Sequence, residues 1–125
     1  MFAPPPQLNS ITICTNKIEE MEDFYLSNLG MAFNEKIQRN GLKNLEYNNN
    51  GFVLCLKEVV GEELTTKNLE ISLLFYGVKE LKNDFKDSEV IFKDQSNLQT
   101  EELIITDPQL NRIQLKEAQT YDARR

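Results

Sequence analysis

The chain has no histidine among its 125 residues, and this absence limits the chemistry that it can perform. Histidine is the usual general base near neutral pH and the commonest metal ligand in proteins. A Ser-His-Asp or Cys-His nucleophile is therefore excluded. The groups that remain for chemistry are carboxylates, amides, hydroxyls and the thiols of Cys14 and Cys55.

The two cysteines are too few for a disulfide scaffold. No Lys or Arg is obviously placed to activate Cys14 or Cys55, so we expect both to be small buried hydrophobic residues. The alternative is a pair of reactive thiols.

The charge balance gives the chain a net charge of −6, from 14 basic and 20 acidic residues. This argues against nucleic acid as a partner, because such a partner requires a basic surface. It leaves a cationic ligand or a merely solvated acidic surface. No apolar run is long enough to cross a bilayer, and the first residues do not read as a signal peptide. We therefore expect a cytoplasmic protein with no membrane partner.

The length suits one domain, and period-two patterns with β-branched residues predict eight strands. These cover residues 8–15, 31–38, 42–47, 51–57, 69–76, 90–93, 101–106 and 112–116. We expect an arm at residues 1–7, modules at about 8–60 and 68–117 within one domain at 8–117, and a tail at 118–125.

Two helices are expected between these strands. The first is predicted to be capped by Asn16, with Glu19 in a capping box, and to end at Gly30. A second helix of about two turns follows the fifth strand, marked by Val78, Leu81 and Phe85. Residues 48–51 and Asp107-Pro108 predict turns, and residues 94–100 a polar loop.

The sequence contains an internal repeat. Val-Leu-Cys-Leu-Lys-Glu at residues 53–58 closes the first half, and Arg-Ile-Gln-Leu-Lys-Glu at residues 112–117 closes the second. Because each half also shows the order strand, helix, strand, strand, strand, we interpret the chain as a tandem duplication.

Two such modules resemble the vicinal oxygen chelate superfamily of glyoxalases, bleomycin-resistance proteins, fosfomycin-resistance enzymes and extradiol dioxygenases. The resemblance is carried by Leu-Asn-Ser-Ile-Thr-Ile at 8–13, Phe-Tyr-Leu-Ser-Asn-Leu-Gly at 24–30, and Asp107-Pro108 with Asn-Arg-Ile-Gln-Leu at 111–115. It implies an α+β fold of two tandem βαβββ modules, whose curved mixed sheet forms a ligand cup with the helices outside. It also implies a homodimer.

Metal-using relatives hold a divalent ion through two His and one Glu, and the resemblance assigns these positions to Ser10, to Ile71 or Leu73, and to Gln114. A hydroxyl, an aliphatic side chain and a neutral amide cannot form that site. We therefore expect no metal and no other cofactor. The chain also departs at Leu110, where relatives usually have Gly, so we expect its backbone to differ there.

On this alignment, alternation along the strands gives each residue a face. The outer face, toward the helices, carries Ile11, Ile13, Leu45, Tyr47, Leu54, Leu74, Leu103, Ile105, Ile113 and Leu115. The cup face carries Cys14 and the candidate ligand-binding residues Ser10, Thr12, Asn44, Glu46, Val53, Cys55, Ile71, Leu73, Phe75, Glu102, Ile104 and Gln114.

These side chains suit a small amphipathic organic molecule. The alternative is that Ile71, Leu73, Phe75 and Ile104 pack together as a second core or a dimer contact. Glu46 and Glu102 could hold a cationic ligand, but we favour two solvated strand residues. Cys14 and Cys55 could also be neighbours in the cup, and Gln114 could bond a ligand or a neighbouring strand.

We therefore expect a metal-independent protein that sequesters a small organic compound, cationic compounds included. No residue is assigned a catalytic role under this hypothesis. One alternative is a metal-free lyase or isomerase with Glu46 or Glu102 as base and Gln114 as oxyanion donor. The other is an interaction or regulatory module whose cup is collapsed.

Overall fold

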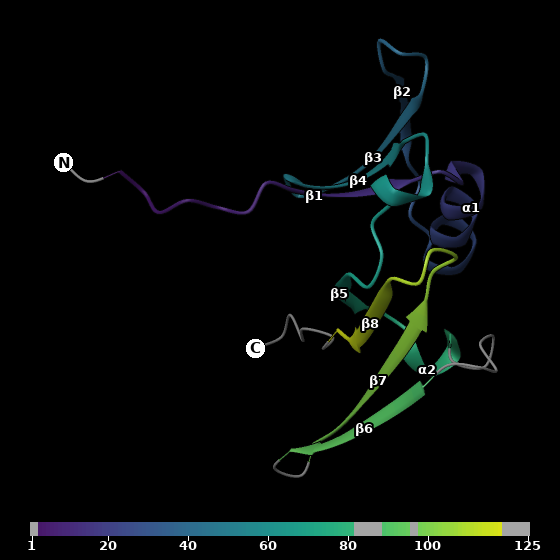
Figure 1. The fold of residues 1–125 in the computed structure, drawn as a ribbon. Coiled ribbons are helices and arrows are strands. Elements are labelled where there is room, and N and C mark those ends of the chain that lie inside the picture. The colour runs from purple at the N-terminus through teal and green to yellow at the C-terminus, as the bar shows by residue number, and fades with distance from the viewer. Residues whose placement is uncertain (1–2, 82–88, 96–97, 119–125) are drawn as a thin grey trace. The chain divides into compact units, whose positions relative to one another are not determined.

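The computed structural model describes residues 3–81, 89–95 and 98–118 (Figure 1). The chain divides into two compact units, Met1–Thr66 and Lys67–Arg125. Each unit contains a strand, a helix and three further strands, so the predicted α+β fold of two βαβββ modules is confirmed. In the part of the chain that the structure describes, no helix is long and apolar enough to span a membrane.

The first unit builds a mixed four-stranded sheet, here called sheet A. Its strands are β1 (Ser10–Thr15), β2 (Asn34–Ile37), β3 (Lys43–Asn49) and β4 (Phe52–Glu58), in the order β1-β4-β3-β2. β1 and β4 are parallel, and the other neighbours are antiparallel. The unit also holds helix α1 (Ile18–Leu29) and the short 3-10 helix η1 (Glu62–Leu64).

One face of sheet A forms the core of this unit. Ile13, Leu45 and Leu56 share that face and are fully buried. Helix α1 contacts β4 and buries Ile18, Met21 and Tyr25. The period of two on the strands and the helical spacing on α1 thus produce one apolar layer between them.

The prediction for α1 is correct at its C-terminal end and wrong at its N-terminal end. The helix starts from Lys17, which makes no side-chain cap hydrogen bond, so the predicted Asn16 cap is wrong. Instead, the hydroxyl of Thr15 bonds the chain just before the helix, where its Oγ1 accepts the backbone N–H of Lys17 at 3.0 Å. At the other end Gly30 adopts φ +72° and donates its N–H to Leu26, which confirms the predicted stop.

The second unit repeats this order in sheet B. Its elements are β5 (Glu70–Phe75), α2 (Val78–Leu81), β6 (Glu89–Gln95), β7 (Leu98–Thr106) and β8 (Arg112–Glu117), with the strands ordered β5-β8-β7-β6. β5 and β8 are parallel, as β1 and β4 are. Phe85, the third marker of the predicted helix, lies outside the described residues.

The predicted polar loop at residues 94–100 is wrong for most of its length. β6 continues to Gln95 and β7 begins at Leu98, and these two residues pair directly in an antiparallel register. Figure 1 shows the two as long neighbouring strands. Backbone pairing with a partner strand therefore overrides the polar composition of this stretch.

The repeated motif occupies equivalent strands. β4 and β8 each pair with a parallel strand on one side and an antiparallel strand on the other. The last residue of the motif differs in use: Glu58 accepts the backbone N–H of Lys43 at 2.8 Å, whereas Glu117 accepts those of Gly77 and Val78. The glutamate at the same position of the motif thus stabilises the β3–β4 hairpin in the first unit and the start of α2 in the second.

A buried polar turn joins β7 to β8. Asp107 Oδ1 accepts the backbone N–H groups of Gln109 and Asn111 at 2.8 and 2.9 Å, and its Oδ2 accepts Asn111 Nδ2 at 3.1 Å. Asn111 Oδ1 in turn accepts the N–H of Leu69 at 3.0 Å, just before β5. The predicted Asp107-Pro108 turn is therefore confirmed, and it also fixes the entry of β5.

Leu110 lies in this turn with φ +72°, the left-handed conformation that glycine favours. The leucine thus holds a conformation that is less costly for glycine, and the expected difference from the backbone of relatives stays a prediction.

We expect Leu110→Gly to raise the free energy of unfolding by about 0.5–1 kcal/mol, because the relieved left-handed strain exceeds the added chain entropy. Leu110→Ala keeps the strain and removes only a side chain that is 61% exposed, so it should change little. Urea unfolding checks both variants, and equal stabilisation by alanine would contradict the backbone explanation.

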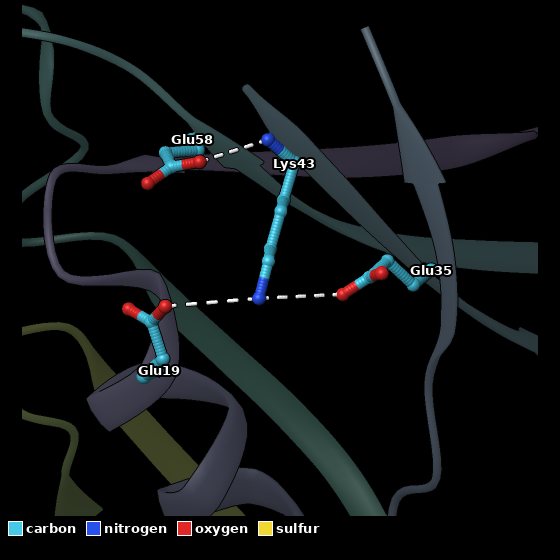
Figure 2. A network of polar contacts seen from close by, with 4 residues as sticks. All are labelled: Glu19, Glu35, Lys43 and Glu58. Carbon is cyan, nitrogen blue, oxygen red and sulfur yellow. Dashed lines mark hydrogen bonds and ion pairs between the residues drawn. The ribbon is translucent and has the colours of Figure 1, made fainter. Parts of the chain in front are cut away.

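A charge network links α1 to the sheet (Figure 2). Lys43 Nζ lies 3.4 Å from Glu35 Oε1 and 3.7 Å from Glu19 Oε1. These carboxylates raise the pKa of Lys43, the hydrogen bond with Glu35 contributing most. One lysine thus connects α1, β2 and β3 through its ammonium, while its backbone N–H is bonded to Glu58 on β4.

Candidate functional site

The face of sheet A that points away from its core is the candidate binding surface of the first unit; we call it open face A. Residues paired directly across strands share a face, and the register sets Thr12, Cys55 and Glu46 in one row. The rows on either side hold Ser10, Val53 and Asn48, and Cys14, Lys57 and Asn44. All predicted candidates of this unit therefore lie on one face, and their role in binding stays a prediction.

Open face A offers hydroxyls, amides and thiols. Ser10 and Thr12 are exposed, whereas Asn44, Val53 and Cys55 are half-buried. Glu46 is not a bare carboxylate, because its Oε1 lies 3.1 Å from Lys36 Nζ.

Asn44 carries an unusual feature of open face A. Its side-chain oxygen Oδ1 is buried and accepts no hydrogen bond from the residues that the structure describes. Buried polar atoms are normally paired, so this oxygen has spare capacity for a donor.

Lys57 is a member of open face A that the sequence analysis missed. It lies opposite Cys14 on one side and opposite Asn44 on the other. It could have been found, since it shares the parity of Val53 and Cys55 within the repeated motif.

In sheet B the register corrects three of the predicted site residues. Ile71 pairs with Ile113, Leu73 with Leu115, and Phe75 with Glu117, so all three lie on the core face. The prediction that places Ile71, Leu73 and Phe75 on the face of Gln114 is wrong, as is that of Leu74 on the core side.

Alternation along β5 agrees with this register, because the other parity holds the polar Glu70 and Ser72 beside Leu74. The wrong placement came from the resemblance, which put a metal-ligand position at Ile71 or Leu73. The opposite face of sheet B, here called open face B, carries Gln114 with the β5 residues Glu70, Ser72 and Leu74. Ile104 and Glu102 also lie on it, as predicted.

Two predicted site residues bind each other on open face B. Gln114 donates a hydrogen bond from Nε2 to Glu102 Oε1. Glu102 is only 3% exposed, so the expectation of a solvated strand residue is wrong for it. The enzyme alternative needs Glu102 as a base and Gln114 as an oxyanion donor, but here each is engaged by the other. This bond therefore offers no support for that alternative.

The divalent-ion site that the resemblance implies does not fit these residues. In the repeat, Ser10 pairs with β4 two residues before Cys55, and Glu70 pairs with β8 two residues before Gln114. Glu70, not Ile71 or Leu73, is therefore the counterpart of Ser10. One carboxylate with a hydroxyl and an engaged amide is a poor donor set for such an ion. Among the described residues, no three His, Cys, Asp or Glu side chains are grouped to hold a metal.

Comparison with known proteins identifies the fold. No family model matches the chain, and no curated protein matches its sequence. A Bacillus anthracis protein assigned to the glyoxalase family superposes with a TM-score of 0.67, at 17% identity, over 95% of this chain and 100% of its own. The chain has the vicinal oxygen chelate fold.

Further structures with the vicinal oxygen chelate fold differ in what their names describe. TnmS3, an antibiotic binding protein from Streptomyces sp. CB03234, gives a TM-score of 0.66 at 15% identity, over 94% of this chain and 100% of its own. The trypanothione-dependent glyoxalase I of Leishmania major gives a TM-score of 0.62 at 20% identity, over 90% of this chain and 87% of its own. At these identities the likeness establishes the fold of this chain.

Proposed function

We propose that this chain is a small-molecule binding protein that sequesters an organic compound without using a metal. The observation that carries the proposal is open face A, where the exposed Ser10 lies beside the half-buried, aliphatic Val53 and the exposed Thr12 beside Cys55, on the same face as the amide of Asn44 on β3. Aliphatic surface with a few polar groups is typical of small-ligand sites. The antibiotic-binding neighbour supports this use of the fold.

The proposal does not extend to a preference for cationic compounds. Glu46 is already paired with Lys36, and Glu102 already accepts a hydrogen bond from Gln114. The ammonium of Lys57 adds a positive charge to open face A instead. A neutral or acidic compound fits the charge of this surface better than a cation does.

Thermal-shift screening of the full chain tests the proposal. We expect at least one compound from a panel of antibiotics and polar metabolites to raise the melting temperature by a few degrees, since a ligand at about 100 times its Kd adds roughly 2.7 kcal/mol. Thr12→Val and Asn44→Leu should reduce that shift, because each removes a polar group from open face A.

Glu20→Gln, on the exposed surface of α1, is the matched control and should leave the shift unchanged. A panel without any stabilising compound would argue against a binding protein. A shift that survives both variants of open face A would place the site elsewhere. Native mass spectrometry of the same sample reports a retained compound and tests the expected homodimer.

A further inference from the structure

Open face A brings the two cysteines of the chain onto adjacent strands. Cys14 lies on β1 and Cys55 on β4, and Thr12 is the residue directly opposite Cys55. The two cysteines therefore stand on the same face, offset by two residues along parallel strands. Both are reduced and half-buried.

The offset between the two cysteines sets a Cα–Cα distance that is too long for a disulfide. Strands ~4.8 Å apart with ~3.3 Å per residue place the two Cα atoms ~8 Å from each other. A disulfide normally requires Cα atoms within about 4.4–6.8 Å, so these thiols cannot form one without movement of the backbone.

Such movement is opposed by the surrounding hydrogen bonds. The N–H of Cys14 donates to Thr66 Oγ1 at 2.9 Å, and its carbonyl accepts the N–H of Thr66 at 2.8 Å. Cys55 lies on β4, which is held between β1 and β3. The thiols are therefore presented by a rigid frame.

We propose that Cys14 and Cys55 form a two-coordinate site for a soft monovalent metal ion such as Cu(I). Two metal–sulfur bonds of about 2.3 Å in line span ~4.6 Å between the sulfurs, if the bonds are as long as those of zinc thiolates. Side chains that lean toward each other across ~8 Å can reach this span, whereas a disulfide demands much closer sulfurs. Thiolate ligands select Cu(I) over hard cations.

The charges of open face A suit the complex. Cu(I) bound by two thiolates carries a net charge of −1, and the cationic residue Lys57 is paired with Cys14 in the register of β1 and β4. Binding forms two Cu–S bonds, breaks two S–H bonds and releases two protons to solvent, with no change in oxidation state. Affinity should therefore rise with pH.

The test titrates the full, reduced chain with Cu(I) under anaerobic conditions, in competition with the chromophore bicinchoninate. We expect one ion per chain, held more tightly at pH 8 than at pH 6. Cys14→Ser and Cys55→Ser should each weaken binding by about 100-fold or more, because a single thiol loses the effective concentration of the second. Cys55→Ala provides a second replacement if serine disturbs the sheet.

Glu20→Gln is the control, since Glu20 is exposed on α1, outside open face A, and supplies no sulfur. It should leave the Cu(I) affinity within a few-fold of that of the unaltered chain. Wild-type affinity in Cys14→Ser, or one ion shared by two chains in native mass spectrometry, would overturn the proposal. The test is independent of the organic-ligand proposal, which the thermal-shift panel judges separately.

Discussion

Asp107→Ala is expected to lower the free energy of unfolding by about 4 kcal/mol, because it leaves several buried donors without their acceptor. The carboxylate is only 2% exposed and accepts two backbone N–H groups and the side-chain amide of Asn111. Losing a partner costs about 1–3 kcal/mol for each buried donor, less where water enters the vacated space. Urea unfolding followed by circular dichroism measures the loss.

Asp107→Asn is the control for this carboxylate. It keeps an oxygen for the N–H groups of Gln109 and Asn111 but turns an amide nitrogen toward Asn111 Nδ2, where two donors then meet. Its cost should be smaller than that of alanine, at about 2 kcal/mol. Faster amide exchange at Leu69 in both variants would show that the turn fixes the entry of β5. A loss below 1 kcal/mol for Asp107→Ala would contradict the role given to this turn.

The first unit could be predicted well from its sequence because its strands alternate cleanly. On β1, Ile11 and Ile13 alternate with Ser10 and Thr12, so parity alone assigns the faces. The register of sheet A places every candidate of this unit as the alternation predicts.

The second unit shows where the resemblance misled the prediction. On β5, Ile71, Leu73 and Phe75 share one parity, whereas the other parity holds Glu70 and Ser72 with Leu74, so alternation alone favours the first three for the core. The resemblance placed them on the ligand face instead, and the pairing of β5 with β8 puts them on the core face. The bond between Gln114 and Glu102 was missed because it joins side chains on two neighbouring strands, and the sequence alone does not show that these two side chains meet.

Local hydrogen bonding also outweighed one strong sequence signal. Asn16 followed by Glu19 is typical of a capping box, yet the helix starts from Lys17. Thr15, buried at the end of β1, uses its hydroxyl to turn the chain one residue before the helix. The strand end therefore sets the start of α1, and this is information that a pattern read along the helix alone does not contain.

Tyr25→Ala should destabilise the first unit by about 4 kcal/mol, as expected for removing a large buried ring. Tyr25 is fully buried on α1, and its ring meets that of Phe33 edge to face at 6.3 Å. The ring centroid of Phe33 in turn lies 6.0 Å from that of Tyr47 on β3. Removing Tyr25 therefore leaves a cavity and breaks the aromatic chain that ties the helix to the sheet.

Two controls and one consequence sharpen this prediction. Tyr25→Phe keeps the ring and should cost about 1 kcal/mol, whereas Tyr76→Ala removes a ring that is 73% exposed and should change stability by less than about 0.5 kcal/mol. Equal losses for Tyr25→Ala and Tyr76→Ala would contradict the packing argument. Because Tyr25 packs with the core face of sheet A, the folded fraction of Tyr25→Phe should bind Cu(I) with unaltered affinity. Stability and thiol chemistry then belong to opposite faces of one sheet.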